Sequence, residues 1–166
     1  LLGMVTMILT TLNERRRAVL AALDRAVSVS STSEILDRAA DLLRDGFPHY
    51  SWVGIYLLQG EELVLGFWNG PEATEHVHIP LGVGVHGVAA RSGRTIVVDD
   101  LSEDPYAEYG LSSFAWARSE IVVPIAIGKT VLGVVAIVSE DTAGFDDGDR
   151  TFLERVARLL SSRIAG

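Results

Sequence analysis

Cysteine is absent from this chain of 166 residues. Its absence excludes disulfides, thiolate metal ligands and a nucleophilic cysteine within the chain, and it fits a reducing compartment. Positive charge is also scarce, because 14 lysines and arginines stand against 22 aspartates and glutamates, which gives a net charge of −8. A chain this acidic argues against a nucleic-acid partner. The basic run at 15–17 adjoins Glu14 and is typical of a solvated helix face.

Long hydrophobic runs are missing as well. Residues 1–12 are apolar, but they fall short of the roughly 20 residues that a transmembrane helix needs, and no positive segment precedes them. We therefore expect a cytoplasmic protein with no membrane partner. We interpret 1–12 as an apolar N-terminal extension or as a remnant of an expression vector, and 13–166 as a single domain with one core.

Three amphipathic helices are indicated by apolar residues that recur every three to four positions. Asn13 is expected to cap the first helix, and Ser31 with Glu34 has the spacing of a capping box at the start of the second. The expected helices cover 13–29, 31–46 and a last stretch that starts at Asp146 or Asp149.

Six apolar stretches have the length and composition of strands, and glycine turns join two pairs of them into antiparallel hairpins. Glycines at 82, 84 and 87 lead into a short helix at 87–92. The order predicts an α/β (α+β) fold with a central antiparallel sheet of about six strands, and with the first and last helices packed on one face. The expected strands are 50–58, 62–68, 76–80, 95–98, 120–127 and 131–139.

Residues 99–119 show no clear periodicity and contain Tyr106, Tyr109, Phe114 and Trp116. A structureless segment of this length is unusual in a compact domain unless it is functional. We expect it to act as a lid over a ligand.

Trp52, Gly54 and Tyr56 alternate along one strand and therefore share a face of the sheet. The glycine leaves a gap between two bulky rings. Either a ligand or a backbone segment approaches closely there, or Gly54 is a packing glycine in a core strand.

Glu120 opens a strand that is otherwise apolar, so its carboxylate must be paired, hydrogen-bonded or exposed at the strand end. It can pair with Arg118 two residues earlier, or accept hydrogen bonds from a cationic or NH-bearing ligand. Ala136 and Val138 are expected to line the same cavity and to make its wall apolar.

His76 and His78 share a strand face, and His86 follows in the glycine-rich turn. Three histidines can bind zinc or a similar ion, but no acidic ligand at a diagnostic spacing accompanies them. We expect exposed or locally hydrogen-bonded imidazoles, with no metal and no cofactor.

Taken together and in order, six local strings resemble the GAF domain family of small-molecule sensors. The resemblance covers roughly residues 30–164. It implies a GAF-like sheet with loops and short helices over a pocket on the face opposite the terminal helices. The strings are 50–57, 79–87, 97–100, 118–125, 133–137 and 144–147.

Within that family the chain is most similar to the free methionine-(R)-sulfoxide reductases, which carry similar Trp-x-Gly-x-Tyr, Ile-Pro-x-Gly-x-Gly-Val and Arg-Ser-Glu-Ile-Val-Val-Pro strings. By this resemblance the family's cysteines fall on His76, His86 and Ser113, none of which is a thiol.

The same resemblance keeps the family's substrate-binding glutamate as Glu120. It places the family's two aspartates on Ala136 and Val138, so that one of three carboxylates is retained. Loss of the thiols is thus accompanied by a change in the pocket.

These observations predict a non-catalytic sensing or regulatory GAF domain. It would bind a small-molecule ligand under the 99–119 loop and signal through its terminal helices as a homodimer. One alternative is a free methionine-(R)-sulfoxide reductase-like enzyme or its degenerate relative. Another is a dimerisation module with a vestigial pocket, held by a stripe of Val19, Leu23 and Val27. No catalytic residue is predicted. The predicted ligand-binding residues are Trp52, Tyr56, His86, Ser113, Trp116, Glu120, Ala136 and Val138.

Overall fold

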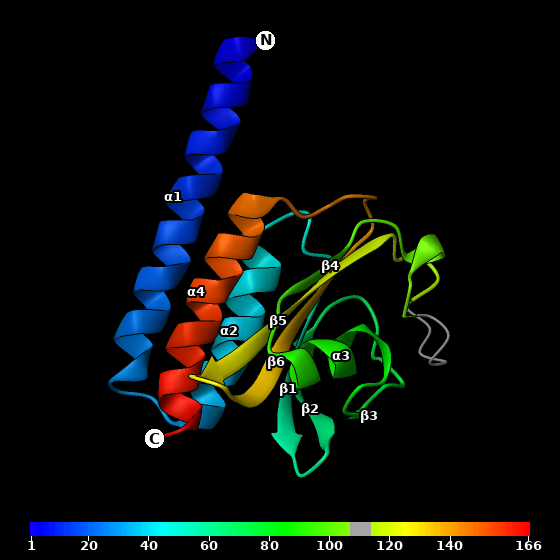
Figure 1. Cartoon of the computed structure of the whole chain (residues 1–166). Helices are drawn as coiled ribbons and strands as arrows, with labels where there is room; N and C mark the ends of the chain where they lie inside the picture. The colour runs from blue at the N-terminus through cyan, green and yellow to red at the C-terminus, as the bar shows by residue number, and fades with distance from the viewer. Residues whose placement is uncertain (107–113) are drawn as a thin grey trace.

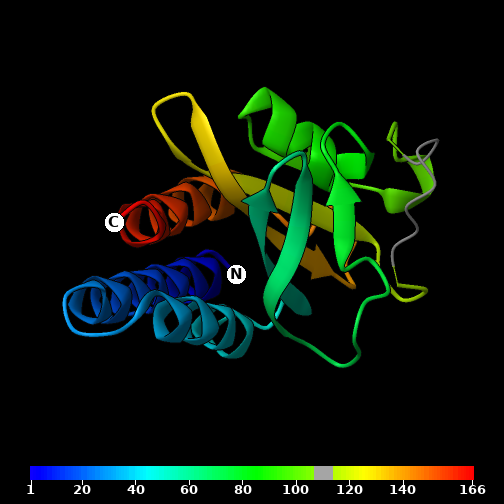
Figure 2. The same ribbon diagram turned by 90° about the horizontal axis from the view of Figure 1, so that it is seen from below.

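One six-stranded sheet organises the chain, and the computed structural model describes residues 1–106 and 114–166. The strand order is β3-β2-β1-β6-β5-β4, and every neighbouring pair is antiparallel. Helices α1, α2 and α4 cover one face of the sheet, whereas α3 lies on the other (Figures 1 and 2). The predicted α+β fold is confirmed.

The elements follow the predicted order, with ends that differ by a few residues apart from the start of α1. The strands are β1 Trp52–Gln59, β2 Glu62–Asn69, β3 His78–Pro80, β4 Ile96–Val98, β5 Ser119–Ile127 and β6 Thr130–Ser139. The helices are α1 Leu2–Val27, α2 Thr32–Gly46, α3 Gly84–Ser92, the 3-10 turn η1 Leu101–Glu103 and α4 Asp147–Ile164.

Local capping fixes two of the helix starts. The Ser31 hydroxyl accepts a hydrogen bond from the backbone of Glu34, and the Glu34 carboxylate accepts one in return, which confirms the predicted capping box of α2. Asp146 and Asp149 form the same reciprocal arrangement at the start of α4. Both helices therefore begin where the sequence places them.

The predicted start of α1 at Asn13 is wrong. The helix begins at Leu2, and the Asn13 side chain instead accepts a hydrogen bond from Arg16 on the next turn. Residues 2–12 contain no proline and mostly residues that tolerate a helix, so nothing stops the helix from extending through them. Thr6 and Thr10 donate their hydroxyls to carbonyls four residues earlier. Figure 1 shows this half of α1 projecting past the other helices.

The apolar stripe of α1 packs into the core between the helices and the sheet. Val19 is 6% exposed and Leu23 is fully buried, both within the same cluster as Leu36 of α2 and Leu153 of α4. Val27, the third residue of the predicted dimerisation stripe, is half-buried and packs against the same cluster. The stripe therefore contributes to the core of the chain itself, while dimerisation stays a prediction.

The first ten residues lie exposed on α1, so we expect their deletion to leave the fold intact. Removing 1–10 should change the free energy of unfolding by no more than about 0.5 kcal/mol, because exposed substitutions away from the core cost little. Urea unfolding followed by circular dichroism measures this. Leu23→Ala in the same helix is the control, with an expected loss of about 2–5 kcal/mol. A deletion as costly as Leu23→Ala would contradict the expectation.

None of the helices in 1–106 and 114–166 combines the length and the hydropathy that crossing a membrane requires. On the sheet face opposite the three long helices, a second apolar cluster joins Trp52 and Tyr56 of β1 to Val85 of α3 and Val138 of β6. The candidate site is built on this face.

Candidate active site

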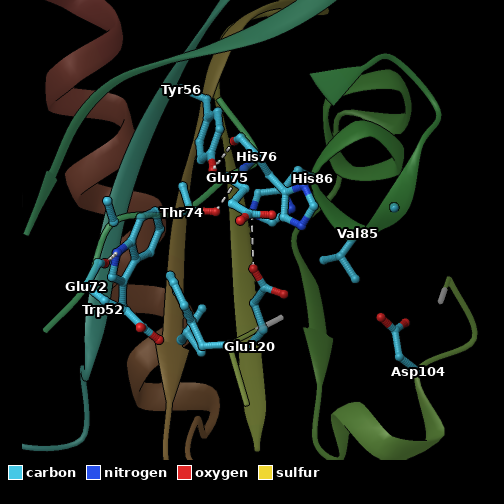
Figure 3. Close-up of a pocket in the computed structure, with 14 residues that line it drawn as sticks. Trp52, Tyr56, Glu72, Thr74, Glu75, His76, Val85, His86, Asp104 and Glu120 are labelled. Atoms are coloured by element: carbon cyan, nitrogen blue, oxygen red, sulfur yellow. Dashed lines mark hydrogen bonds and ion pairs between the residues drawn. The ribbon is translucent and has the colours of Figure 1, made fainter. Parts of the chain in front are cut away.

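A pocket of about 240 Å³ opens on the α3 face of the sheet (Figure 3). Its floor comes from β1, β5 and β6, and its sides come from the first turn of α3, the 72–76 segment and the parts of the 99–119 segment that the structure describes. The lining residues are Trp52, Tyr56, Glu72, Ala73, Thr74, Glu75, His76, Gly84, Val85, His86, Asp104, Phe114, Glu120 and Val138.

Trp52 forms one wall of the pocket and is 1% exposed. Its indole Nε1 donates to the backbone oxygen of Glu72 at 3.1 Å, and its ring lies between those of Trp68 and Phe114, with centroids 6.3 and 5.5 Å away. A Cβ added to Gly54 would come within 2.3 Å of this ring. The gap at Gly54 is therefore filled by Trp52, as the packing interpretation predicts.

Tyr56 faces the same pocket from two residues further along β1. Its hydroxyl donates to the backbone oxygen of His76 at 3.0 Å, and its ring centroid lies 5.2 Å from that of His86. Burial, and then the charge of Glu120, raise the pKa of Tyr56. The phenol therefore stays neutral and holds the 72–76 segment against β1.

An ion pair between His86 and Glu120 lies at the centre of the pocket (Figure 3). His86 Nε2 is 3.1 Å from Glu120 Oε1, and the two side chains are 15% and 6% exposed. Arg118 does not take this role, because its guanidinium donates to the backbone oxygens of Ala115 and Ala117. The buried carboxylate is thus paired, as physical chemistry requires, but with a partner from another element.

Three further carboxylates line the pocket, on Glu72, Glu75 and Asp104. Burial raises the pKa of Asp104, against a hydrogen bond from the backbone of Tyr106 that lowers it. None of the three is among the residues predicted from the sequence, because they lie in connecting segments without periodicity. Their acidity is the only signal that the sequence carries for them. Together with Glu120 they give the pocket a negative lining suited to a cationic group.

Of the predicted ligand-binding residues, Trp52, Tyr56, His86, Glu120 and Val138 line the pocket. Ala136 and Trp116 do not line it, and Ser113 is outside the described residues. Ala136 is fully buried on the same face, where its short side chain lies opposite Gly54 and the Trp52 ring packs. Trp116 stacks on Phe114, which does line the pocket.

Trp116 acts on the pocket through its neighbours. Its Nε1 donates to Glu72 Oε1 at 2.9 Å, and its ring stacks on that of Phe114 with centroids 4.9 Å apart. Phe114 in turn lines the cavity. Trp116 therefore anchors the end of the 99–119 segment to the 72–76 segment.

Two of the three predicted histidines, His76 and His86, line the pocket, whereas His78 does not. His78 is exposed at the sheet edge, where its Nδ1 lies 3.2 Å from Glu62 Oε1. Across residues 1–106 and 114–166, no three histidine, aspartate or glutamate side chains come together as metal ligands. The titratable groups that line the pocket are carboxylates and imidazoles, which can take part in acid–base chemistry.

Several known proteins are similar to this chain in sequence. A model of the GAF domain matches residues 29–165. Free methionine-R-sulfoxide reductase of Saccharomyces cerevisiae is 38% identical over 116 residues, which cover 67% of this chain and 61% of that protein. The Escherichia coli protein of the same name is 30% identical over 130 residues, which cover 78% of this chain and 76% of that protein.

A solved structure shows the same likeness in three dimensions. Free methionine-R-sulfoxide reductase from Neisseria meningitidis, determined in complex with its substrate, superposes with a TM-score of 0.81 at 34% identity. The match covers 90% of this chain and 88% of that chain.

These relatives overturn the expectation of a non-catalytic sensing domain. They are named as reductases, and they support the alternative of a free methionine-(R)-sulfoxide reductase-like enzyme. The expectation rested on the absence of cysteine, which removes a nucleophile from the chain but leaves the pocket and its charged groups in place. The prediction of no catalytic activity is corrected accordingly.

Proposed function

This chain belongs to the GAF domain family, and from that premise we propose that it catalyses the reduction of free methionine-(R)-sulfoxide by a thiol taken from solution. The observation that carries the proposal is the buried Glu120–His86 pair in an acidic pocket that is also lined by aromatic rings. The relatives that share the fold and are named for this reaction support the same substrate.

The size and charge of the pocket suit a free amino acid. Its volume of about 240 Å³ lies just below the range of about 300–1,000 Å³ that is common for larger drug-sized ligands. An α-ammonium group can be held by the carboxylates that line the pocket, which belong to Glu72, Glu75, Asp104 and Glu120. Free methionine sulfoxide carries such a group, whereas a methionine sulfoxide residue inside a polypeptide does not. The ring of Trp52 supplies an apolar wall for the methylene and methyl groups.

The electrons must come from outside the chain, because the sequence holds no cysteine. Reduction of one sulfoxide consumes two thiols and gives one thioether, one disulfide and one water. The sulfoxide sulfur is reduced by two electrons and the two thiol sulfurs are oxidised to the disulfide. A dithiol supplies both thiols at once and is the more efficient co-substrate, since the second attack is then intramolecular.

Turnover of separated methionine sulfoxide diastereomers tests the proposal. Purified protein, dithiothreitol and free methionine-(R)-sulfoxide should yield methionine above the rate with heat-denatured protein, as measured by liquid chromatography. The (S) diastereomer is the stereochemical control. Isothermal calorimetry with the (R) sulfoxide measures binding separately. Binding without turnover, or equal rates for both diastereomers, would refute the proposed reaction.

Glu120→Gln is expected to weaken binding of methionine-(R)-sulfoxide at least about tenfold, because a hydrogen bond to a charged group contributes about 1.5–3 kcal/mol. Glu62→Gln is the matched control, because Glu62 also pairs with a histidine but at the exposed sheet edge. Calorimetry should show an unchanged Kd for Glu62→Gln. If the two variants bind the sulfoxide with equal affinity, Glu120 does not contribute to its binding.

A further inference from the structure

His86 combines features that the binding of an amino acid alone does not require. It lies in the first turn of α3, lines the pocket and is 15% exposed, so it is shielded from bulk water yet reachable by a ligand. Its Nε2 faces Glu120 Oε1 at 3.1 Å, and the ring of Tyr56 lies against it. A carboxylate that holds one ring nitrogen fixes the orientation of the imidazole.

We propose that His86 is the proton donor that allows the sulfoxide oxygen to leave as water, an inference that rests on the proposed function. Because Nε2 is held by Glu120, the proton for the sulfoxide oxygen would come from Nδ1. Glu120 is the positioning residue of this pair.

The chemistry explains why a proton donor is needed. A thiolate attacks the sulfoxide sulfur, an S–S bond forms and the S–O bond breaks. The oxygen leaves as water only after it has gained two protons, one from His86 and one from the first thiol. The second thiolate then attacks the sulfur of the first thiol, which breaks the S–S bond to the substrate, releases the thioether and forms the disulfide. His86 regains its proton from the second thiol.

Other groups in the pocket are less suited to this role. The Tyr56 hydroxyl already donates to the backbone oxygen of His76, and burial holds it neutral. The carboxylate of Asp104 accepts the backbone N–H of Tyr106 at 2.8 Å, and Figure 3 shows it beyond Val85, apart from the His86–Glu120 pair. Its place in the pocket, on the far side of Val85 from the His86–Glu120 pair, is what makes Asp104 less suited to this role.

Removal of the imidazole and its chemical rescue test the proposal. His86→Ala should lower kcat for methionine-(R)-sulfoxide with dithiothreitol at least about 100-fold, the usual contribution of general acid catalysis, with a much smaller change in the Kd from calorimetry. Added imidazole should raise the kcat of His86→Ala at least about tenfold, because it can enter the space left by the side chain and donate the same proton. A purely structural histidine would not be rescued in this way.

His78→Ala is the matched control, since His78 also pairs with a glutamate but is exposed outside the pocket. It should retain the wild-type kcat and show no response to imidazole beyond that of the wild type. If His86→Ala turns over at the wild-type rate, or loses activity without any rescue, the role of His86 is refuted while the proposed function stands. If the wild type itself does not turn over, the proposed function fails first.

Discussion

Replacing Asp149 with alanine is expected to lower the free energy of unfolding by about 3–5 kcal/mol, the usual cost of removing one partner from a buried ion pair. Asp149 is 3% exposed. Its Oδ1 lies 3.2 Å from an Arg16 nitrogen and 2.9 Å from His49 Nε2, and it accepts the Tyr50 hydroxyl at 2.7 Å. The substitution leaves three buried or half-buried donors without this acceptor.

The position of Asp149 in the fold explains the size of the expected effect. Arg16 belongs to α1, His49 and Tyr50 lead into β1, and Asp149 itself lies in the first turn of α4. Its Oδ2 also accepts the backbone N–H of Asp146, which completes the capping box. One carboxylate therefore joins two helices to the sheet. Asp147→Ala, an exposed acid in the same turn, is the control and should cost no more than about 1 kcal/mol.

Acidification provides a second check on Asp149. Burial alone would raise the pKa of its carboxyl, but hydrogen bonds from His49, the Asp146 backbone and Tyr50 outweigh burial and hold the pKa below its usual range. A carboxyl with a depressed pKa in the folded state stabilises the fold above its unfolded pKa of about 3.9 and loses that effect as the pH falls. The stability difference between wild type and Asp149→Ala should therefore be constant near neutral pH and shrink below about pH 4. A difference that grows on acidification would contradict this origin.

Local signals carried most of the fold prediction. The capping box at Ser31, the start of the last helix at Asp146 or Asp149, and the glycine turns of the two hairpins depend on residues close together in the chain, so the sequence alone could identify them. The start of α1 could not be found in this way. No side chain caps the start of α1 and residues 2–11 lie exposed, so neither capping nor amphipathic pattern marked them as helix.

The site was predictable only where it follows strand alternation. Trp52 and Tyr56 share a face because every second residue of a strand does, and this placed them in the pocket. The sequence offered neighbouring Arg118 or a ligand as the partner of Glu120, whereas the fold supplies His86 from the first turn of α3. Pairing across such a separation depends on how α3 packs on the sheet, which local sequence does not specify.

The functional prediction gave too much weight to what is absent. Loss of the cysteines and of two strand carboxylates suggested a pocket no longer suited to the reductase substrate. The structure instead supplies carboxylates from other segments, on Glu72, Glu75 and Asp104. A charged pocket can thus persist after the residues that first identified it have changed, because side chains from several loops reach the same cavity.

Gly54→Ala is expected to abolish measurable binding of methionine-(R)-sulfoxide, with a Kd raised at least about 100-fold. The added Cβ would lie 2.3 Å from the Trp52 ring and 3.3 Å from the Tyr56 ring. Trp52 cannot simply turn aside, because it is held by its hydrogen bond to Glu72 and by the rings of Trp68 and Phe114. Displacement of the ring into the cavity removes the space for the ligand, and such overpacking typically costs about 1–3 kcal/mol of stability.

Gly66→Ala is the matched control for this last prediction. Gly66 lies on β2, the strand that pairs with β1, but a Cβ there would meet only the backbone oxygen of Ile55 at an ordinary 3.5 Å. Calorimetry should give the wild-type Kd for Gly66→Ala and no detectable heat for Gly54→Ala. Both variants should keep a cooperative thermal transition, so that lost binding cannot be attributed to unfolding. Wild-type affinity in Gly54→Ala would show that the ligand does not occupy the space beside Trp52, because that space is the first to close when its ring moves.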